Sequence, residues 1–158
     1  MSSEISELVR VVEEQESKLQ FSRFTHDDAW TIGSELVRLG RERNLGITVD
    51  ITKGDQQVFH AALAGTTADN DDWVARKIRT VRRFGSSSFL VGRRHAASGS
   101  DFNQSTGLSF SQFVAHGGCF PVVIRDAGIV GTVTVSGLPQ KDDHDLVVEV
   151  LEWFLAQA

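Results

Sequence analysis

Two histidines, each close to a glycine turn, are the residues of this chain best suited to chemistry. An imidazole can ligate haem iron or a divalent metal, and it can act as a general base near neutral pH. Glycine lets the backbone turn tightly or approach a ligand closely. We therefore expect a small ligand to bind where two corners of the chain meet, with His116 as the leading residue. The corner residues are His116, Gly117, Gly118, Ser136, Gly137, Asp143 and His144.

A structural role for both histidines stays open. Residues 109–112 have the spacing of a capping box, which predicts a short helix from 109 to 115. His116 could then cap the C-terminus of that helix, where a cation is favoured. His144 could pack beside the second corner while Asp143 supports the start of the last helix. Adjacent helical residues point about 100° apart, so these two are not expected to form a dyad.

A cationic stripe on a predicted long helix offers a second way to hold a ligand. Arg76, Arg79 and Arg83 recur at helical spacing, with Lys77 beside them. Guanidinium groups bind carboxylates through two parallel hydrogen bonds. The same stripe could instead be a solvated face or a subunit contact. Cys119 is the single cysteine, so we expect a buried small hydrophobe and no zinc site of four protein ligands.

Composition bounds the class of protein. A length of 158 residues predicts one domain, spanning 1–158, with room for a core. The net charge of −5 argues against a nucleic-acid partner, which would need a basic face. No apolar run approaches the roughly 20 residues of a membrane helix, and the polar opening is not typical of a signal peptide. We therefore expect a cytoplasmic protein with neither nucleic acid nor a membrane as its partner.

The hydrophobic pattern predicts two β-hairpins set among helices. Period-2 alternation marks the strands, and apolar residues at i, i+3, i+4 and i+7 mark the helices. The predicted elements are a helix over 5–12, a short extended piece over 19–24, a helix from 27, a hairpin of 47–52 with 58–63, a helix over 73–84, an irregular loop over 96–108, a helix over 109–115, a hairpin of 119–124 with 128–136, and a helix after 139. Hairpins separated by helices favour an α+β fold with an antiparallel sheet.

The chain resembles the HbpS-like family, the relatives of GlcG that are described as haem-degrading proteins. The matching residues are Trp73 to Lys77, His116, Gly117, Gly118, Phe120, Pro121, Val135 to Pro139, Asp143 and His144. The resemblance implies a profilin-like three-layer αβα domain with a five-stranded antiparallel sheet and helices on both faces. It also implies a homo-oligomer, with haem as the candidate cofactor. The Arg93-Arg94-His95 segment departs from the family pattern.

Three functions are compatible with these residues. The leading hypothesis is a homo-oligomeric protein that binds a small ligand near the His-Gly-Gly corner. Haem is the candidate, with His116 as its metal ligand and with Arg76 and Lys77 as partners of its carboxylates. The first alternative is a non-enzymatic assembly or adaptor protein, and the second is a metal-dependent enzyme using His116 and His144. No recognised catalytic motif, such as a phosphate loop or an HExxH helix, supports an enzyme.

Overall fold

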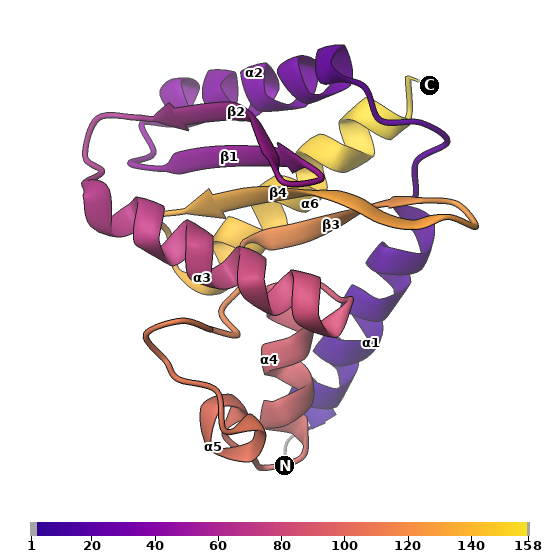
Figure 1. The fold of residues 1–158 in the computed structure, drawn as a ribbon, viewed down its shortest axis with the longest axis vertical. Helices are drawn as coiled ribbons and strands as arrows, with labels where there is room; N and C mark the ends of the chain where they lie inside the picture. Colours follow the sequence, from indigo (N-terminus) through magenta and orange to yellow (C-terminus); the bar gives the residue numbers. More distant parts are fainter. Residues whose placement is uncertain (1–2, 158) are drawn as a thin grey trace.

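The computed structural model describes residues 3–157, so residues 1, 2 and 158 of the expected 1–158 domain, and with them the first two residues of the polar opening, lie outside the described part. The elements follow in the order α1 (Ser3–Lys18), α2 (His26–Glu42), β1 (Thr48–Lys53), β2 (Gln56–Ala62), α3 (Ala68–Phe84), α4 (Ser88–Ala97), α5 (Phe102–Thr106), β3 (Cys119–Ile124), β4 (Gly128–Ser136) and α6 (Gln140–Leu155). Figure 1 shows α3 in front of the sheet and α6 behind it. The prediction of an α+β chain with helices on both sheet faces is confirmed at this level.

The strands form one antiparallel sheet in the order β2-β1-β4-β3. Successive side chains of a strand point to opposite faces. One face is apolar: Val49, Ile51, Val133 and Val135 join the main core with residues of α2 and α6. The other face is largely polar and lies under α3. Its buried residues include Thr48, Asp50, Thr52, Thr132, Thr134 and Ser136.

Side-chain caps fix the helices that border the sheet. Thr25 accepts a hydrogen bond from the amide of Asp28 and closes a capping box at the start of α2. Thr67 does the same at the start of α3, which ends at Gly85 in the left-handed conformation. The predictions of α2, α3, α6 and both hairpins are confirmed. Helix α6 begins after Pro139 without a side-chain cap.

The prediction of a five-stranded, profilin-like sheet is wrong, because the described sheet has four strands. The predicted extended piece over 19–24 reaches the sheet at one point. The amide of Phe21 donates to the Val123 carbonyl at 2.7 Å, and the Arg125 amide donates to the Phe21 carbonyl at 2.9 Å. Phe21 and Phe24 bury their rings in the core, so their alternation reflects packing and not a ladder of hydrogen bonds.

The outer edge of β3 is blocked by three different means. The side-chain oxygen of Ser88 accepts from the amide of Cys119 at 3.1 Å. Pro121 has no amide proton to offer. Phe21 then takes the next backbone positions. In contrast, β2 pairs only with β1 within residues 3–157, so the other edge of the sheet is open.

The predicted helix over 109–115 is also wrong, because this stretch is a loop with a turn at 110–112. Side chains of α3 take up its backbone carbonyls: Arg76 binds that of Phe110, Arg79 that of Gln112, and Thr80 that of Val114, at 3.3, 3.1 and 2.8 Å. These carbonyls are therefore held toward α3, and only a single turn forms at the start of the stretch.

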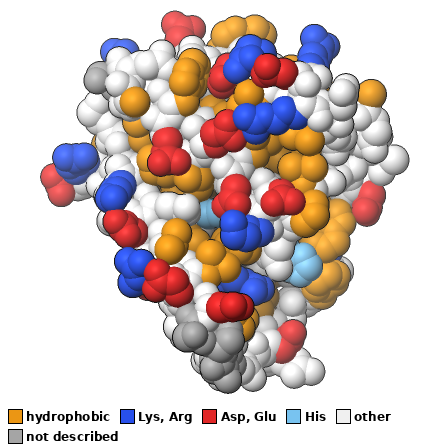
Figure 2. All heavy atoms as spheres, turned by 180° about the vertical axis from the view of Figure 1, so that it is seen from behind, with side chains coloured by type: hydrophobic (Ala, Val, Ile, Leu, Met, Phe, Trp, Pro, Cys, Tyr) orange, Lys and Arg blue, Asp and Glu red, His pale blue; other side chains and the backbone are white. Residues whose placement is uncertain are grey.

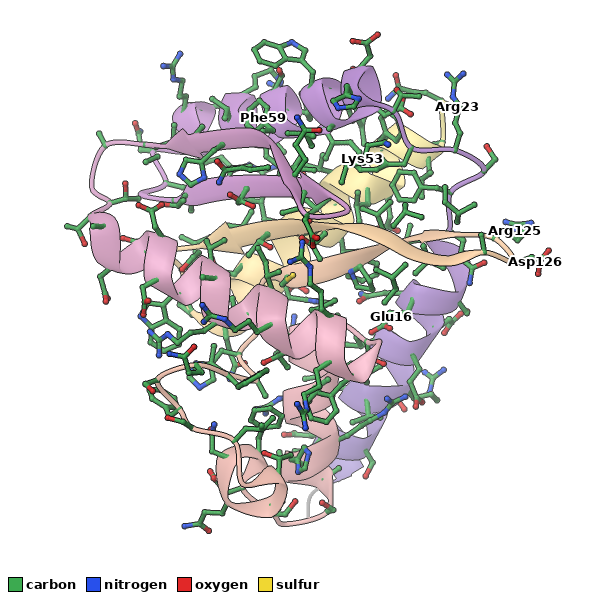
Figure 3. All side chains as sticks on the ribbon, in the orientation of Figure 1. Glu16, Arg23, Lys53, Phe59, Arg125 and Asp126 are labelled. Atoms are coloured by element: carbon green, nitrogen blue, oxygen red, sulfur yellow. The ribbon has the colours of Figure 1, made fainter. Side chains whose placement is uncertain are left out.

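Helix α4 was not predicted, because residues 89–91 form a continuous apolar run without helical spacing. Ser87 caps it by accepting from the amide of Leu90. Phe89 and Leu90 then pack against α1, whose Glu16 accepts from the amide of Ser87 at 3.1 Å (Figure 3). The pair α1 and α4 therefore forms the lower part of the molecule in Figure 1.

The surface mixes charges of both signs. Figure 2, which shows the molecule from behind, has acidic and basic side chains interspersed with apolar ones. No helix within residues 3–157 has both the length and the hydropathy needed to cross a lipid bilayer.

Candidate functional site

The two glycine corners meet because β3 begins where β4 ends. The Val135 amide donates to the Gly118 carbonyl at 3.0 Å, which joins the two corners directly. Gly118 has φ of 136° and Gly137 has φ of 143°, both in the region that favours glycine. A Cβ at Gly118 would lie 2.3 Å from the Val135 carbonyl oxygen, and one at Gly137 would lie 2.2 Å from that of Gly46. Only glycine fits either position.

A pocket of about 280 Å³ opens between these corners and the first turns of α3 and α6. We call it the corner pocket. Of the predicted site residues it is lined by Lys77, His116, Ser136, Gly137 and Asp143. Asn70, Trp73 and Gln140 also line it. The volume lies near the lower limit of pockets that hold small organic ligands.

A buried ion pair forms one wall of the corner pocket. Lys77 and Asp143 are each 2% exposed, and Lys77 Nζ lies 3.2 Å from Asp143 Oδ2 and 3.1 Å from the Val135 carbonyl oxygen. The other carboxylate oxygen accepts from the Leu138 amide at 2.9 Å. Burial raises the pKa of Asp143 to about 6 against the opposing effect of Lys77, and burial lowers the pKa of Lys77. The lysine charge is therefore already compensated inside the protein.

His116 forms the mouth of the corner pocket and is exposed. Its ring lies 5.2 Å from the Trp73 ring and 6.3 Å from the Phe110 ring, measured between centroids. Partial desolvation by these neighbours, together with the charges of Lys77, Arg93 and Arg76, lowers the pKa of His116. Within the described residues neither ring nitrogen has a hydrogen-bond partner. At neutral pH the ring is therefore neutral, with a lone pair free to bind a metal centre. Because no described helix ends at His116, the alternative of a helix cap is wrong.

Gly117 belongs to the first corner and Ser136 to the second, where Ser136 lines the corner pocket. The Gly117 amide donates to the side chain of Gln140 at 2.9 Å, which ties the first corner to the start of α6. A Cβ at Gly117 would lie 2.4 Å from the Gln140 carbonyl oxygen. Gln140 was missed because nothing in its spacing marks it, although it directly follows the matched Ser-Gly-Leu-Pro segment.

Arg76 lies beside the corner pocket but does not line it. Its guanidinium group stacks on the Trp73 ring at 4.2 Å, lies 3.0 Å from Asp72 and donates to the Phe110 carbonyl. The other arginines of the stripe also contact the 110–114 loop. Arg79 donates to the Gln112 carbonyl, and Arg83 lies over the Phe113 ring. The stripe packs the 110–114 loop onto α3.

His144 lies on the buried face of α6 and does not line the corner pocket with His116. It is 1% exposed, stacks on Phe89 at 4.8 Å and bonds through Nε2 to Gln15 at 2.7 Å. Its Nδ1 is buried with no partner among the described residues. Burial lowers the pKa of His144 to about 4, so it is neutral at physiological pH.

No cluster of three or more His, Cys, Asp or Glu side chains within residues 3–157 could hold a metal ion. Burial raises the pKa of Cys119 to about 12, so its thiol stays protonated. A haem iron, in contrast, needs only one protein ligand in an axial position. The neutral His116, with free nitrogens beside two aromatic rings, fits that requirement.

Comparison with known proteins gives the same family as the motifs. The UPF0303 protein SCO2848 of Streptomyces coelicolor is 54% identical over 149 residues, which cover 94% of each chain. The crystal structure of the Ybr137w protein aligns with a TM-score of 0.86 at 27% identity, over 94% of this chain and 88% of that one. The crystal structure of the PduOC:Heme complex shares the fold, with a TM-score of 0.68 at 13% identity over 82% and 93%. The family model described as haem degrading protein HbpS-like matches residues 24–152, and the chain belongs to this family.

Proposed function

We propose that this protein binds a small ligand in the corner pocket, with haem as the candidate and His116 as the residue that would hold its iron. The observation that carries the proposal is the neutral, unbonded imidazole of His116 at the mouth of a pocket built by two glycine corners. The family description and the haem complex of PduOC, a protein of the same fold, support haem.

The residues around the corner pocket have different parts in such a site. His116 would hold the iron, while Trp73 and Phe110 would pack against the edge of a planar ligand. Lys77 and Asp143 are bonded to each other, so we assign them to shaping the pocket wall. A bound haem would supply the redox chemistry that the family description implies.

Titration of the purified protein with hemin tests this function. We expect a saturable shift of the Soret band in the wild type and at least a 10-fold weaker shift in His116→Ala. His26→Ala is the matched control, because His26 is also exposed but bonds the Gln56 side chain away from the corner pocket. A Soret shift that is absent in the wild type, or equal in His116→Ala, would contradict the proposal.

We also propose that the protein self-associates, as an assembly protein would. Trp30 on α2 is 66% exposed and its ring lies 5.6 Å from that of Phe59 on β2. Figure 3 shows Phe59 between these two elements, at the open edge of the sheet. Large exposed aromatic residues are enriched in interfaces between proteins. Sedimentation velocity across a range of concentrations tests this proposal, and a monomer throughout would contradict it.

A further inference from the structure

A second cavity lies on the other side of His116. It has a volume of about 230 Å³ and is lined by parts of α4, α5 and the 110–116 loop. His116 and Gln140 line both this side pocket and the corner pocket. The imidazole therefore stands between two cavities, and a ligand bound to it can extend into either one.

Arg93 of α4 lines the side pocket and is free of partners. Within residues 3–157 it makes no ion pair and no hydrogen bond, and its Nε is buried without an acceptor. Its guanidinium carbon lies 5.5 Å from the centroid of the Phe89 ring. The neighbouring Arg94 is different, because it lies 2.9 Å from a Glu13 oxygen on the surface.

A half-buried guanidinium group without an acceptor is an unusual arrangement. Buried donors are nearly always paired, since leaving one unpaired forfeits its hydration. The charge of Arg93 also reaches His116, whose pKa it helps to lower. The Asp101 carboxylate lines the same pocket but accepts from the Gln104 amide as the cap of α5. Within the described residues it makes no ion pair with Arg93.

We propose that Arg93 is the anion anchor of the ligand site, binding a carboxylate of a ligand that lies against His116. The guanidinium fork matches a carboxylate with two parallel hydrogen bonds. This inference rests on the proposed function for the presence of a ligand beside His116, but not on that ligand being haem. Arg93 suits a ligand carboxylate better than Arg76 and Lys77 do, because those two cations already pair with Asp72 and Asp143.

Benzoate and its neutral isostere benzamide test the anchor directly. The nitrogen-15 resonance of the Arg93 Nε–H group is followed while each compound is added to the full chain. We expect benzoate to shift it in a saturable manner and benzamide to leave it unchanged. Equal effects of the two compounds, or no shift up to the solubility limit of benzoate, would overturn the proposal.

Variants separate the anchor from its surroundings. Arg93→Gln should weaken benzoate binding about 10-fold, as expected for the loss of one charged bidentate contact. Arg94→Gln is the matched control and should bind benzoate like the wild type. Arg93→Lys keeps the charge without the fork, so it should bind more weakly than wild type and more tightly than Arg93→Gln. Binding that is unchanged in Arg93→Gln would show that benzoate binds elsewhere and would overturn the anchor.

Hemin distinguishes the failure of this inference from that of the proposed function. If benzoate binds through Arg93 while hemin gives no Soret shift, the anchor stands and haem is not the ligand. If hemin binds through His116 but Arg93→Gln changes neither hemin nor benzoate binding, the anchor is wrong and the proposed function stands.

Discussion

The two faces of the sheet are equally buried but differ in composition. Toward α2 and α6 the strands present Val49, Ile51, Val133 and Val135, which belong to the main core. Toward α3 the same strands present threonines, Asp50 and Ser136, all at most 7% exposed. The apolar face gains free energy from burial, whereas the polar face must satisfy its hydrogen bonds. The corner pocket lies at the end of the polar face, where the sheet contributes polar groups rather than core residues.

The largest expected effect comes from breaking the ion pair on the polar side. Lys77→Met leaves the buried Asp143 without its cation, and we expect a loss of about 3–5 kcal/mol in the free energy of unfolding. The double variant Lys77→Met/Asp143→Asn should recover most of this loss, because the amide oxygen can still accept from the Leu138 amide. Urea unfolding at pH 7 measures both. A double variant no more stable than Lys77→Met would show that the charge is not the cause.

A smaller effect is expected in the pH dependence of the free energy of unfolding, and it comes from the buried His144. The folded pKa of His144 is depressed to about 4 from the unfolded value of 6.5, so its contribution is complete above pH 6.5 and is lost as pH falls toward 4. The full shift corresponds to about 3 kcal/mol. His144→Phe, which keeps a ring beside Phe89 and Phe120, should remove this pH dependence.

Unfolding free energies between pH 7 and pH 4 test the role of His144 when wild type and variant are compared. The exposed His26→Gln serves as the control and should follow the wild type. Parallel curves for wild type and His144→Phe would mean that His144 titrates normally in the folded protein.

The smallest expected effect is a difference in stability between variants of threonines on the polar face whose hydroxyl groups are hydrogen-bonded and variants of those whose hydroxyl groups are not. Thr52 shares a hydrogen bond of 2.7 Å with Thr132, whereas Thr48 Oγ1 has no partner among the described residues. We expect Thr52→Val to lose about 1 kcal/mol and Thr48→Val to gain up to about 1 kcal/mol. Thermal or urea unfolding of the two variants checks this opposition. The same sign for both would mean that the hydroxyl bonds do not decide the stability of this face.

The sequence predicted correctly those helices and strands that are determined by residues close together in the chain. The alternation of Ile47, Val49 and Ile51 and the acidic first turns of α2, α3 and α6 correspond to real strands and helices. The predictions were wrong where distant contacts decide. The 109–115 helix is absent because α3 takes its carbonyls, and the fifth strand is a single bridge because Phe21 and Phe24 turn into the core.

The site was predictable in part for the same reason. Glycine spacing placed His116, Ser136, Gly137 and Asp143 at corners, and the antiparallel hairpin brings those corners together. The sequence did not predict which cations are paired inside the protein and which one is left without a partner. Arg76 pairs with Asp72 one helical turn away, but it also binds the distant Phe110 carbonyl, and Lys77 pairs with Asp143 of α6. Which cation is left unpaired therefore depends on residues far along the chain.

The unequal margins of the sheet have a consequence for how copies of this chain could join. Ser88, Pro121 and Phe21 close the β3 margin, so within residues 3–157 the sheet offers a free margin for a further strand only beside β2. If two copies paired through β2, the free backbone groups of each β2 strand would be bonded to those of the other. Such growth stops at a symmetric pair and cannot propagate into a fibre.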